Sequence, residues 1–514
     1  MSKIPPAGRL RYLLLPALLL AGCAGPATLE VVEAPPPGEP VVTLTILQLN
    51  DVYEIAPIAG GTLGGLARVA TIRERLLRED PNVLTVIAGD FFSPSVLGTA
   101  RVEGGRLDGK QMVAVLNALG LDVATFGNHE FDVSEEAFLQ RLAESDFPYV
   151  SANVTDASGA LFPNAREHLL LPVEDETGAT MTLGVVGAVL PANPTDYVRY
   201  EDPLAALAEE VAEIADSADV VLALTHLAFE DDARVADEVP RVDLVLGGHE
   251  HENLRAYRGR GLTPILKADA NATTVYVHRL RYDTTTGSLR MDSELVRVSD
   301  AIPDDPEVAA EVRRWVDLAY AGFREAGFEP DEVVTVTAEP LEGREAVLRN
   351  QPTNLGRLTA EAFLHEAERG GAPAELALLN SGVIRIEDVV PAGPVTQYDV
   401  LRILPFPNLV LTVEVRGDVL RQALSQGLAN RGSGGFLQTT GVAQAEDGAW
   451  LVGGEPLDDA RVYRVAVNDF LVSGRERGLD FFDAEANPNV TVVARHRDVR
   501  MALIDELRRV YGQP

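Results

Sequence analysis

Gly127-Asn128-His129-Glu130-Phe131-Asp132 is the stretch that decides how the first half of this chain folds. It follows residues 122–126, a short apolar run that predicts a buried strand, so its polar side chains begin where that strand ends. The stretch Gly247-Gly248-His249-Glu250-His251 stands in the same relation to the apolar run 242–246. Both stretches place imidazole, amide and carboxylate groups at strand ends, where α/β folds form their sites.

Three further polar pairs stand at predicted strand ends: Asn50-Asp51, Gly89-Asp90 and Thr225-His226. Carboxylate, amide and imidazole groups are the ligands that hydrolytic metal sites use. Taken alone, a strand-end Asp is often a helix cap, and a single His is often a satisfied core residue. However, four of the eight histidines of the chain fall within these five stretches. Five such stretches, each after a predicted strand, therefore favour one shared metal site.

Apolar runs that predict strands alternate with amphipathic segments through the first 300 residues. The predicted strands cover residues 41–49, 83–88, 122–126, 183–190, 220–224, 242–246 and 274–282, and the predicted helices cover 64–78, 111–119 and 203–215. Beyond a predicted connecting helix at 303–326, the pattern predicts strands at 333–336, 376–379, 409–415 and 462–467 and a helix at 354–369. This alternation indicates layered α/β units in both halves.

Length and charge narrow the class of protein further. The chain has 514 residues, whereas single cores stop growing near about 250–300 residues, so we expect two domains. The formal net charge of −34 argues against nucleic acid as a partner, because a polyanion needs a basic face. An anionic substrate would have to be attracted locally, by bound metals or by clustered arginines.

The first 23 residues predict a lipoprotein signal peptide. A basic segment precedes the apolar run 13–20, which is too short to span a bilayer. Leu20-Ala21-Gly22-Cys23 resembles the bacterial lipobox and holds the only cysteine of the chain; an ordinary signal peptide with a chance Cys is the alternative. Residues 24–40, rich in Pro, Glu and Ala, predict a flexible tether. We expect a lipid anchor on Cys23 to be the only membrane contact, in the cell envelope and, in a Gram-negative cell, on the periplasmic face of the outer membrane.

The order of the five polar stretches resembles the calcineurin-like metallophosphoesterase superfamily, to which GNHEFD and GGHEH are highly specific. Residues 351–358 (QPTNLGRL), 380–385 (NSGVIR) and 405–408 (PFPN) resemble the substrate domain of 5′-nucleotidases. The resemblance covers about residues 41–490. It implies an α/β fold with a four-layer catalytic domain over 41–300, a β-sandwich flanked by helices. A connecting helix over 301–330 and an α/β substrate-binding domain over 331–514 would follow.

The resemblance also implies a binuclear site with two divalent ions, zinc or manganese, held by Asp51, Asp90, Asn128, His226, His249 and His251. Asp90 would bridge the ions; Asp51 and His251 would complete the first site, and the remaining three residues the second. The two ions would polarise the phosphoryl oxygens and activate the attacking water. His129 would stabilise the developing charge or the leaving oxygen, and Asp132 would orient its ring.

The second half would bind the organic part of a nucleotide. The resemblance implies that Phe406 and Phe470 stack on the nucleobase, although core packing is the alternative for each ring. Four polar residues would complete the substrate site, with arginines on the phosphate or ribose and the others on ribose hydroxyls: Arg349, Arg385, Asn380 and Asp480.

The chain departs from the family pattern in two places. The first strand ends in Asp51-Val52-Tyr53, where the family has Asp-x-His, so the first ion is expected to keep three ligands and to bind weakly. If Tyr53 faces the site, Glu54 should face away, because neighbours on an extended segment point to opposite sides. The second departure is 474–481 (GRERGLDF), a longer and more charged turn. Its arginines suit either a more anionic substrate or a solvated loop.

These patterns predict hydrolysis of nucleoside 5′-monophosphates to nucleoside and phosphate. UDP-sugar hydrolysis and 2′,3′-cyclic-nucleotide phosphodiesterase activity are alternatives that the motifs do not separate. A different alternative is a non-catalytic nucleotide-binding lipoprotein whose first metal site has decayed. The presence of both His129 and Asp132 favours the enzyme, because a decayed site has no physical need for the pair. Metal identity, base preference and oligomeric state are left open by the sequence.

Overall fold

The computed structural model describes residues 41–514, except residues 176, 193 and 387. The predicted signal peptide with Cys23 and the predicted tether at 24–40 lie outside the described residues. Within the part of the chain that is described, no helix combines the length and the apolar character needed to cross a membrane.

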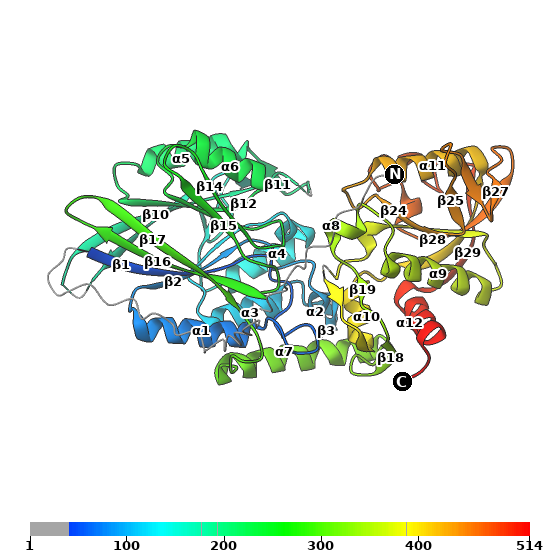
Figure 1. Ribbon diagram of the computed structural model, residues 1–514, viewed down its shortest axis with the longest axis horizontal. Helices are drawn as coiled ribbons and strands as arrows, with labels where there is room; N and C mark the ends of the chain where they lie inside the picture. Colours follow the sequence, from blue (N-terminus) through cyan, green and yellow to red (C-terminus); the bar gives the residue numbers. More distant parts are fainter. Residues whose placement is uncertain (1–40, 176, 193, 387) are drawn as a thin grey trace, which may run out of the picture. The chain divides into compact units, whose positions relative to one another are not determined.

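Two β-sheets form the centre of the first half (Figure 1). The first has the order β17-β16-β1-β2-β5-β6-β8, with the bounds Ser288–Arg297, Thr274–Asp283, Val41–Leu49, Val83–Ala88, Val123–Thr125, Tyr149–Val150 and Ala165–Arg166. The second has the order β14-β15-β13-β12-β10-β9, with the bounds Leu254–Arg258, Thr263–Lys267, Leu244–Gly247, Val220–His226, Thr180–Val189 and His168–Glu174. Buried residues of both sheets, including Ile46, Val86 and Leu222, share one core.

Helices cover the other face of each sheet. The first sheet shares its outer core with α1 (Leu66–Glu79), α3 (Lys110–Leu119) and α4 (Glu135–Glu144), and the second with α5 (Pro203–Ile214) and α6 (Phe229–Glu238). The helix predicted at 64–78 is α1, and its predicted apolar face, which includes Leu66 and Val69, is buried. The four layers expected for this half are therefore confirmed.

Short elements complete the first half: α2 (Val96–Thr99), β3 (Arg101–Val102), β4 (Gly105–Arg106), η1 (His129–Asp132), β7 (Val154–Asp156) and β11 (Val198–Tyr200). The long helix predicted at 303–326 is α7 (Pro306–Glu325). Its start is fixed by Asp305, whose side chain accepts hydrogen bonds from the backbone N–H groups of Glu307 and Val308, both at 3.0 Å. α7 packs against α1 and α3 before the chain enters the second half.

The second half is built on a five-stranded sheet with the order β24-β20-β28-β23-β29, with the bounds Leu437–Thr440, Leu376–Asn380, Val462–Asn468, Leu409–Arg416 and Val490–Asp498. One face of the sheet packs with α9 (Asn354–Arg369) and α12 (Val499–Tyr511), and the other with α11 (Gly417–Ala429). The expected second α/β unit is thus confirmed.

Short elements also surround this second sheet. They are β18 (Val333–Thr337), β19 (Leu341–Glu342), α8 (Glu345–Leu348), η2 (Ser381–Val383), β21 (Val389–Val390), β22 (Gly393–Thr396), α10 (Gln397–Ile403), β25 (Val442–Gln444), β26 (Trp450–Val452), β27 (Glu455–Pro456), η3 (Leu471–Ser473) and η4 (Asp480–Phe482). Among them, α10 contacts the first half, because Tyr398 and Arg402 both reach Glu54.

Candidate metal centre and substrate cleft

The polar stretches of the first half meet at the carboxyl ends of parallel strands. Asp51 follows β1 and Asp90 follows β2, its parallel neighbour. In the second sheet His226 ends β12, and His249 and His251 follow the parallel strand β13. Ligand atoms of Asp51, Asp90 and His251 lie within 4.8 Å of one another. Folding therefore brings candidate ligands from both sheets into one group.

His226 joins this group through one ring nitrogen. Its Nε2 lies 3.2 Å from Oδ2 of Asp90 and 3.8 Å from Oδ1 of Asp51. Its Nδ1–H donates a hydrogen bond to the carbonyl oxygen of Ala88 at 2.7 Å, which leaves Nε2 to face the carboxylates. The ring centroid of His249 is 5.5 Å from that of His226. Release of the proton on Nε2 to solvent would give the lone pair that a metal ligand requires.

The loop after β5 packs closely against Asp90. Asn128 is buried there, and the backbone N–H of His129 donates to Oδ1 of Asp90 at 2.8 Å. A Cβ atom at Gly127 would overlap the same carboxylate oxygen, so only glycine allows this approach. The structure thus places Asn128, another predicted ligand, in a loop that touches the bridging candidate.

Four of the candidate ligands have a left-handed backbone. The φ angles are 53° at Asp51, 57° at Asp90, 90° at His249 and 60° at His251. Such angles cost a non-glycine residue about 1–3 kcal/mol and persist only where the surroundings impose them. Strain of this kind, gathered on the residues that converge, is typical of a functional site.

The charges of the group are matched to a cation. Burial is the largest single effect and raises the pKa values of Asp51 and Asp90, but His226 together with His251 at Asp51, and His226 together with His129 at Asp90, hold both pKa values below their usual range. Burial lowers the pKa of His226, yet Asp90 and Asp51 raise it to about 9. Burial lowers the pKa of His249 to about 4, so its ring is neutral near pH 7. Ionised carboxylates beside a neutral imidazole form a donor set that fits a divalent metal.

Glu130 holds two of the site loops together. Its Oε2 accepts hydrogen bonds from the backbone N–H groups of Asp90 at 2.9 Å and Gly127 at 2.5 Å. Its Oε1 accepts from Phe91 at 2.7 Å and Phe92 at 3.1 Å. Sequence reasoning assigned Glu130 no role, and its place inside GNHEFD was the only signal for one. Its carboxylate fixes the loop after β2 relative to the loop after β5.

A buried ionic cluster beside the histidine loops was also missed by sequence reasoning. Nζ of Lys267 lies 2.7 Å from Oδ2 of Asp232 and 2.7 Å from the carbonyl oxygen of Leu227, and it contacts Oε2 of Glu250. Both Lys267 and Asp232 are fully buried. Glu250 stands between the two histidines of GGHEH, so the cluster fixes that loop to the end of β15.

His129 lies at the boundary between the two halves. Its Nδ1 is 2.6 Å from Oδ2 of Asp132. This is the hydrogen-bond distance that Asp132 needs in order to orient the ring. Its Nε2 is 3.5 Å from Nη2 of Arg385, which belongs to the second half. A predicted catalytic residue and a predicted substrate residue are therefore neighbours.

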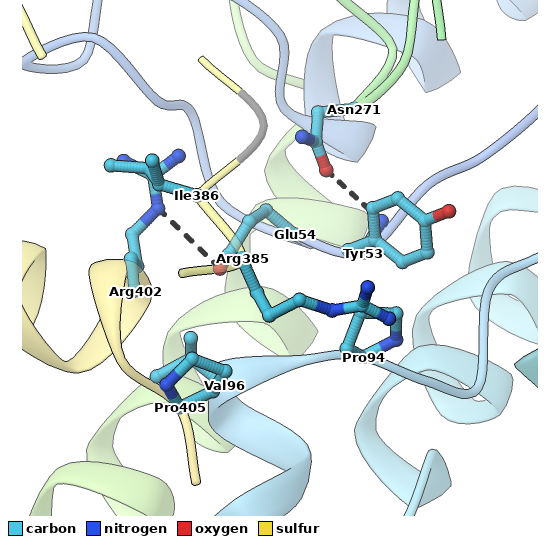
Figure 2. Close-up of a pocket in the computed structure, with 9 residues that line it drawn as sticks. All are labelled: Tyr53, Glu54, Pro94, Val96, Asn271, Arg385, Ile386, Arg402 and Pro405. Carbon is cyan, nitrogen blue, oxygen red and sulfur yellow. Dashed lines mark hydrogen bonds and ion pairs between the residues drawn. The ribbon is translucent and has the colours of Figure 1, made fainter. Parts of the chain in front are cut away.

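Two cavities adjoin this boundary. The smaller is lined by Tyr53 and Arg385, together with residues of both halves that Figure 2 shows. The larger, of about 920 Å³, is lined by Phe406 and Phe470 of the second half and by Asp132 of the first. Phe406 is 37% exposed, which is unusual for a core ring. Both predicted stacking residues thus face one cavity with the partner of His129.

The other predicted substrate residues lie elsewhere. In the described part of the chain, neither cavity is lined by Arg349, Asn380 or Asp480. Arg349 pairs with Glu345, and Nδ2 of Asn380 donates to Oε2 of Glu476 at 2.9 Å. Asp480 is exposed at the start of η4. Their contacts with a nucleotide stay predictions.

Both halves of the chain match known families. Residues 44–253 match the calcineurin-like phosphoesterase family, and residues 333–484 match the 5′-nucleotidase C-terminal domain. The chain is 27% identical over 494 residues to the 5′-nucleotidase of Bos taurus, with 84% of this chain and 83% of the bovine protein covered. It is 26% identical over 501 residues to the 5′-nucleotidase of Homo sapiens, with 84% and 83% covered.

The fold agrees with these matches. The solved structure of the 5′-nucleotidase precursor from Thermus thermophilus has a TM-score of 0.72 and 24% identity, and the match covers 91% of this chain and 97% of that one. The two family matches thus fall on the two halves of this chain in turn, and the bovine relative aligns along most of both. The chain therefore belongs to the 5′-nucleotidase family of the calcineurin-like metallophosphoesterases and is a metal-dependent phosphoric ester hydrolase.

Proposed function

We propose that this protein hydrolyses nucleoside 5′-monophosphates to nucleoside and phosphate. The observation that carries the proposal is the cavity of about 920 Å³, which Phe406 and Phe470 share with Asp132. A nucleotide in this cavity would place its base beside the two rings and its phosphate toward His129, the partner of Asp132. Aromatic rings bind any base by stacking and so suit a general nucleotidase.

Two divalent ions, zinc or manganese, are part of this proposal. Asp51, Asp90 and His251 would hold the first ion, and the second would be held by the remaining ligands together with Asp90: Asn128, His226 and His249. When bound, the ions supply Lewis acidity to the phosphoryl oxygens and lower the pKa of the attacking water.

The roles of the remaining residues follow from the hydrogen bonds around His129. Its Nδ1–H is donated to Asp132 at 2.6 Å, so the ring is held with Nε2 toward Arg385. A proton on Nε2 would stabilise negative charge on the phosphoryl group or on the leaving oxygen. The guanidinium of Arg385 would bind the phosphate by paired hydrogen bonds and keep it beside this nitrogen.

A second candidate is the hydrolysis of a nucleotide that has a second phosphate group, such as a UDP-sugar. Arg106 and Arg475 line the same cavity as the two phenylalanines. The guanidinium carbon of Arg475 lies 5.6 Å from the ring centroid of Phe470. Two cations near the base site would suit an additional phosphate.

Chromatographic product analysis together with phosphate release separates the candidates, over a panel of nucleoside 5′-monophosphates, UDP-sugars and 2′,3′-cyclic nucleotides with Mn, Zn, Co and Mg, because only the monophosphates release inorganic phosphate in one step. We expect the highest kcat/KM for nucleoside 5′-monophosphates, with little dependence on the base. A preference for UDP-sugars or 2′,3′-cyclic nucleotides would replace the proposal with that activity. Binding of nucleotides without turnover in any metal would show that the chain is a binding protein.

Phe406→Ala and Phe470→Ala should each weaken use of nucleotides selectively. Stacking on one ring contributes about 1–3 kcal/mol, so kcat/KM should fall by about 5–150-fold, mostly through KM. Hydrolysis of a small aryl phosphate, which has no base, should change little. Phe229→Ala is the control, because Phe229 is half-buried and lines neither cavity. An equal loss with both substrates would show that the two rings are structural.

A further inference from the structure

Tyr53, which stands where the family pattern has a histidine, points into the candidate metal centre. The side chain is 4% exposed, and its ring meets that of His251 edge-on, with centroids 5.6 Å apart. Its Oη lies 2.9 Å from Nε2 of His251 and 3.3 Å from Oδ2 of Asp90. The phenol oxygen is therefore in contact with two candidate ligands of the first ion.

The backbone of this segment is fixed on both sides. The backbone N–H of Tyr53 donates to Oδ1 of Asn271 at 3.0 Å, as Figure 2 shows. The next residue, Glu54, faces the other way, as the alternation of an extended segment predicts. Its carboxylate accepts a hydrogen bond from Oη of Tyr398 at 2.8 Å and lies 3.6 Å from Nε of Arg402, both on α10. These contacts fix the backbone around Tyr53 and so keep its ring directed toward His251 and Asp90.

The distances around Oη are those of atoms that share one ion. Nitrogen and oxygen ligands lie about 2.0–2.2 Å from a divalent transition metal, so neighbouring ligand atoms are about 2.8–3.6 Å apart. The separation of 3.3 Å between Nε2 of His251 and Oδ1 of Asp51 falls in this range. So do both distances from the Tyr53 oxygen, 2.9 and 3.3 Å. The phenol oxygen thus lies at a distance from the other candidate ligand atoms that suits a further ligand of the first ion.

We propose that the Tyr53 oxygen is a ligand of the first metal ion and makes that site selective for a harder ion than the second. The inference rests on the proposed binuclear site. The phenol would bind as phenolate, with its proton released to water. The first ion would then have oxygen ligands from Asp51, Asp90 and Tyr53 and one nitrogen ligand from His251. Hard anionic oxygen ligands favour manganese or iron, whereas the imidazoles of the second site suit zinc.

Loading with ferric iron gives a direct readout, because a phenolate bound to Fe(III) produces a visible charge-transfer absorption band. We expect the wild-type protein to show this band and Tyr53→Phe to lack it. Tyr257→Phe is the matched control and should keep the band, since Tyr257 is an exposed residue whose oxygen accepts a hydrogen bond from Arg255. A band of equal intensity in Tyr53→Phe, or no band in iron-loaded wild type, would overturn the assignment.

Calorimetric titration with Mn²⁺ and Zn²⁺ separates this inference from the proposed function. We expect two sites in wild type. In Tyr53→Phe, Mn²⁺ binding at one of them should weaken by at least the roughly 10–100-fold that loss of a residue behind a ligand costs. Tyr53→His should restore two sites but shift the first toward Zn²⁺. Two unchanged sites in Tyr53→Phe would overturn the tyrosine ligand while leaving the hydrolase intact. Absence of metal binding by wild type would overturn both.

Discussion

His129→Ala should lower the rate of phosphate release by about 10²–10³-fold, because it removes a donor aimed at charge that develops in the transition state. The ring of His129 contacts Asp132 at 2.6 Å, and its other nitrogen lies 3.5 Å from Arg385 of the second half. The loss should appear in kcat as well as in kcat/KM, since the donor acts on the transition state more than on the bound substrate.

Metal content distinguishes this role from that of a ligand. Two ions should bind to His129→Ala as tightly as to wild type by calorimetry, while an assay of phosphate release shows the loss. His168→Ala is the matched control, because His168 also pairs with a carboxylate, Glu210 at 2.7 Å, but lies at the far edge strand β9. Near-wild-type turnover in His129→Ala, or loss of a metal ion, would contradict the assigned role.

The arrangement of the candidate ligands could be predicted because it depends on strand ends. Asp51, Asp90 and His226 follow or end apolar runs of strand length, and parallel neighbours place such ends at one edge. The orientation of Glu54 away from the site was also predictable from alternation alone. By contrast, α6 was not predicted, because only Val235 and Ala236 of its apolar residues are buried, beside the buried Asp232, and its sequence is short and rich in acidic residues.

Other features could not be predicted, because they depend on contacts between distant segments. Glu130 gains its role from four backbone N–H groups that only the folded loops bring to it. Lys267 stands at the end of an apolar run. In a sequence, a lysine in that position usually indicates a cation that is exposed to solvent after a strand. The Tyr53 oxygen is a similar case, since the sequence shows a missing histidine but not where the phenol points.

Lys267→Met should destabilise the protein by about 3–5 kcal/mol, because it leaves buried carboxylates without their cation. The three N–H donors of the ammonium meet three acceptors: the carboxylates of Asp232 and Glu250 and the carbonyl oxygen of Leu227. Lys267→Arg should also be destabilising, because a planar guanidinium cannot reproduce the arrangement around a compact ammonium. Lys110→Met is the control; this exposed lysine at the start of α3 should matter by less than about 0.5 kcal/mol.

The dependence of this loss on pH identifies its cause. Burial raises the pKa of Asp232 to about 6, although Lys267 opposes the rise, so removal of the lysine should raise that pKa further. A carboxyl whose folded-state pKa is raised contributes stability at low pH that is lost as the pH rises through that value. In Lys267→Met, where the pKa of Asp232 is higher, the free energy of unfolding should keep falling above pH 6. In wild type, the contribution of Asp232 to that free energy no longer changes with pH well above 6. Urea unfolding at pH 6 and pH 8.5 should therefore show a gap between wild type and variant that widens with pH. A gap that is constant with pH would mean that lost packing of the side chain, and not the unpaired carboxylate, causes the destabilisation.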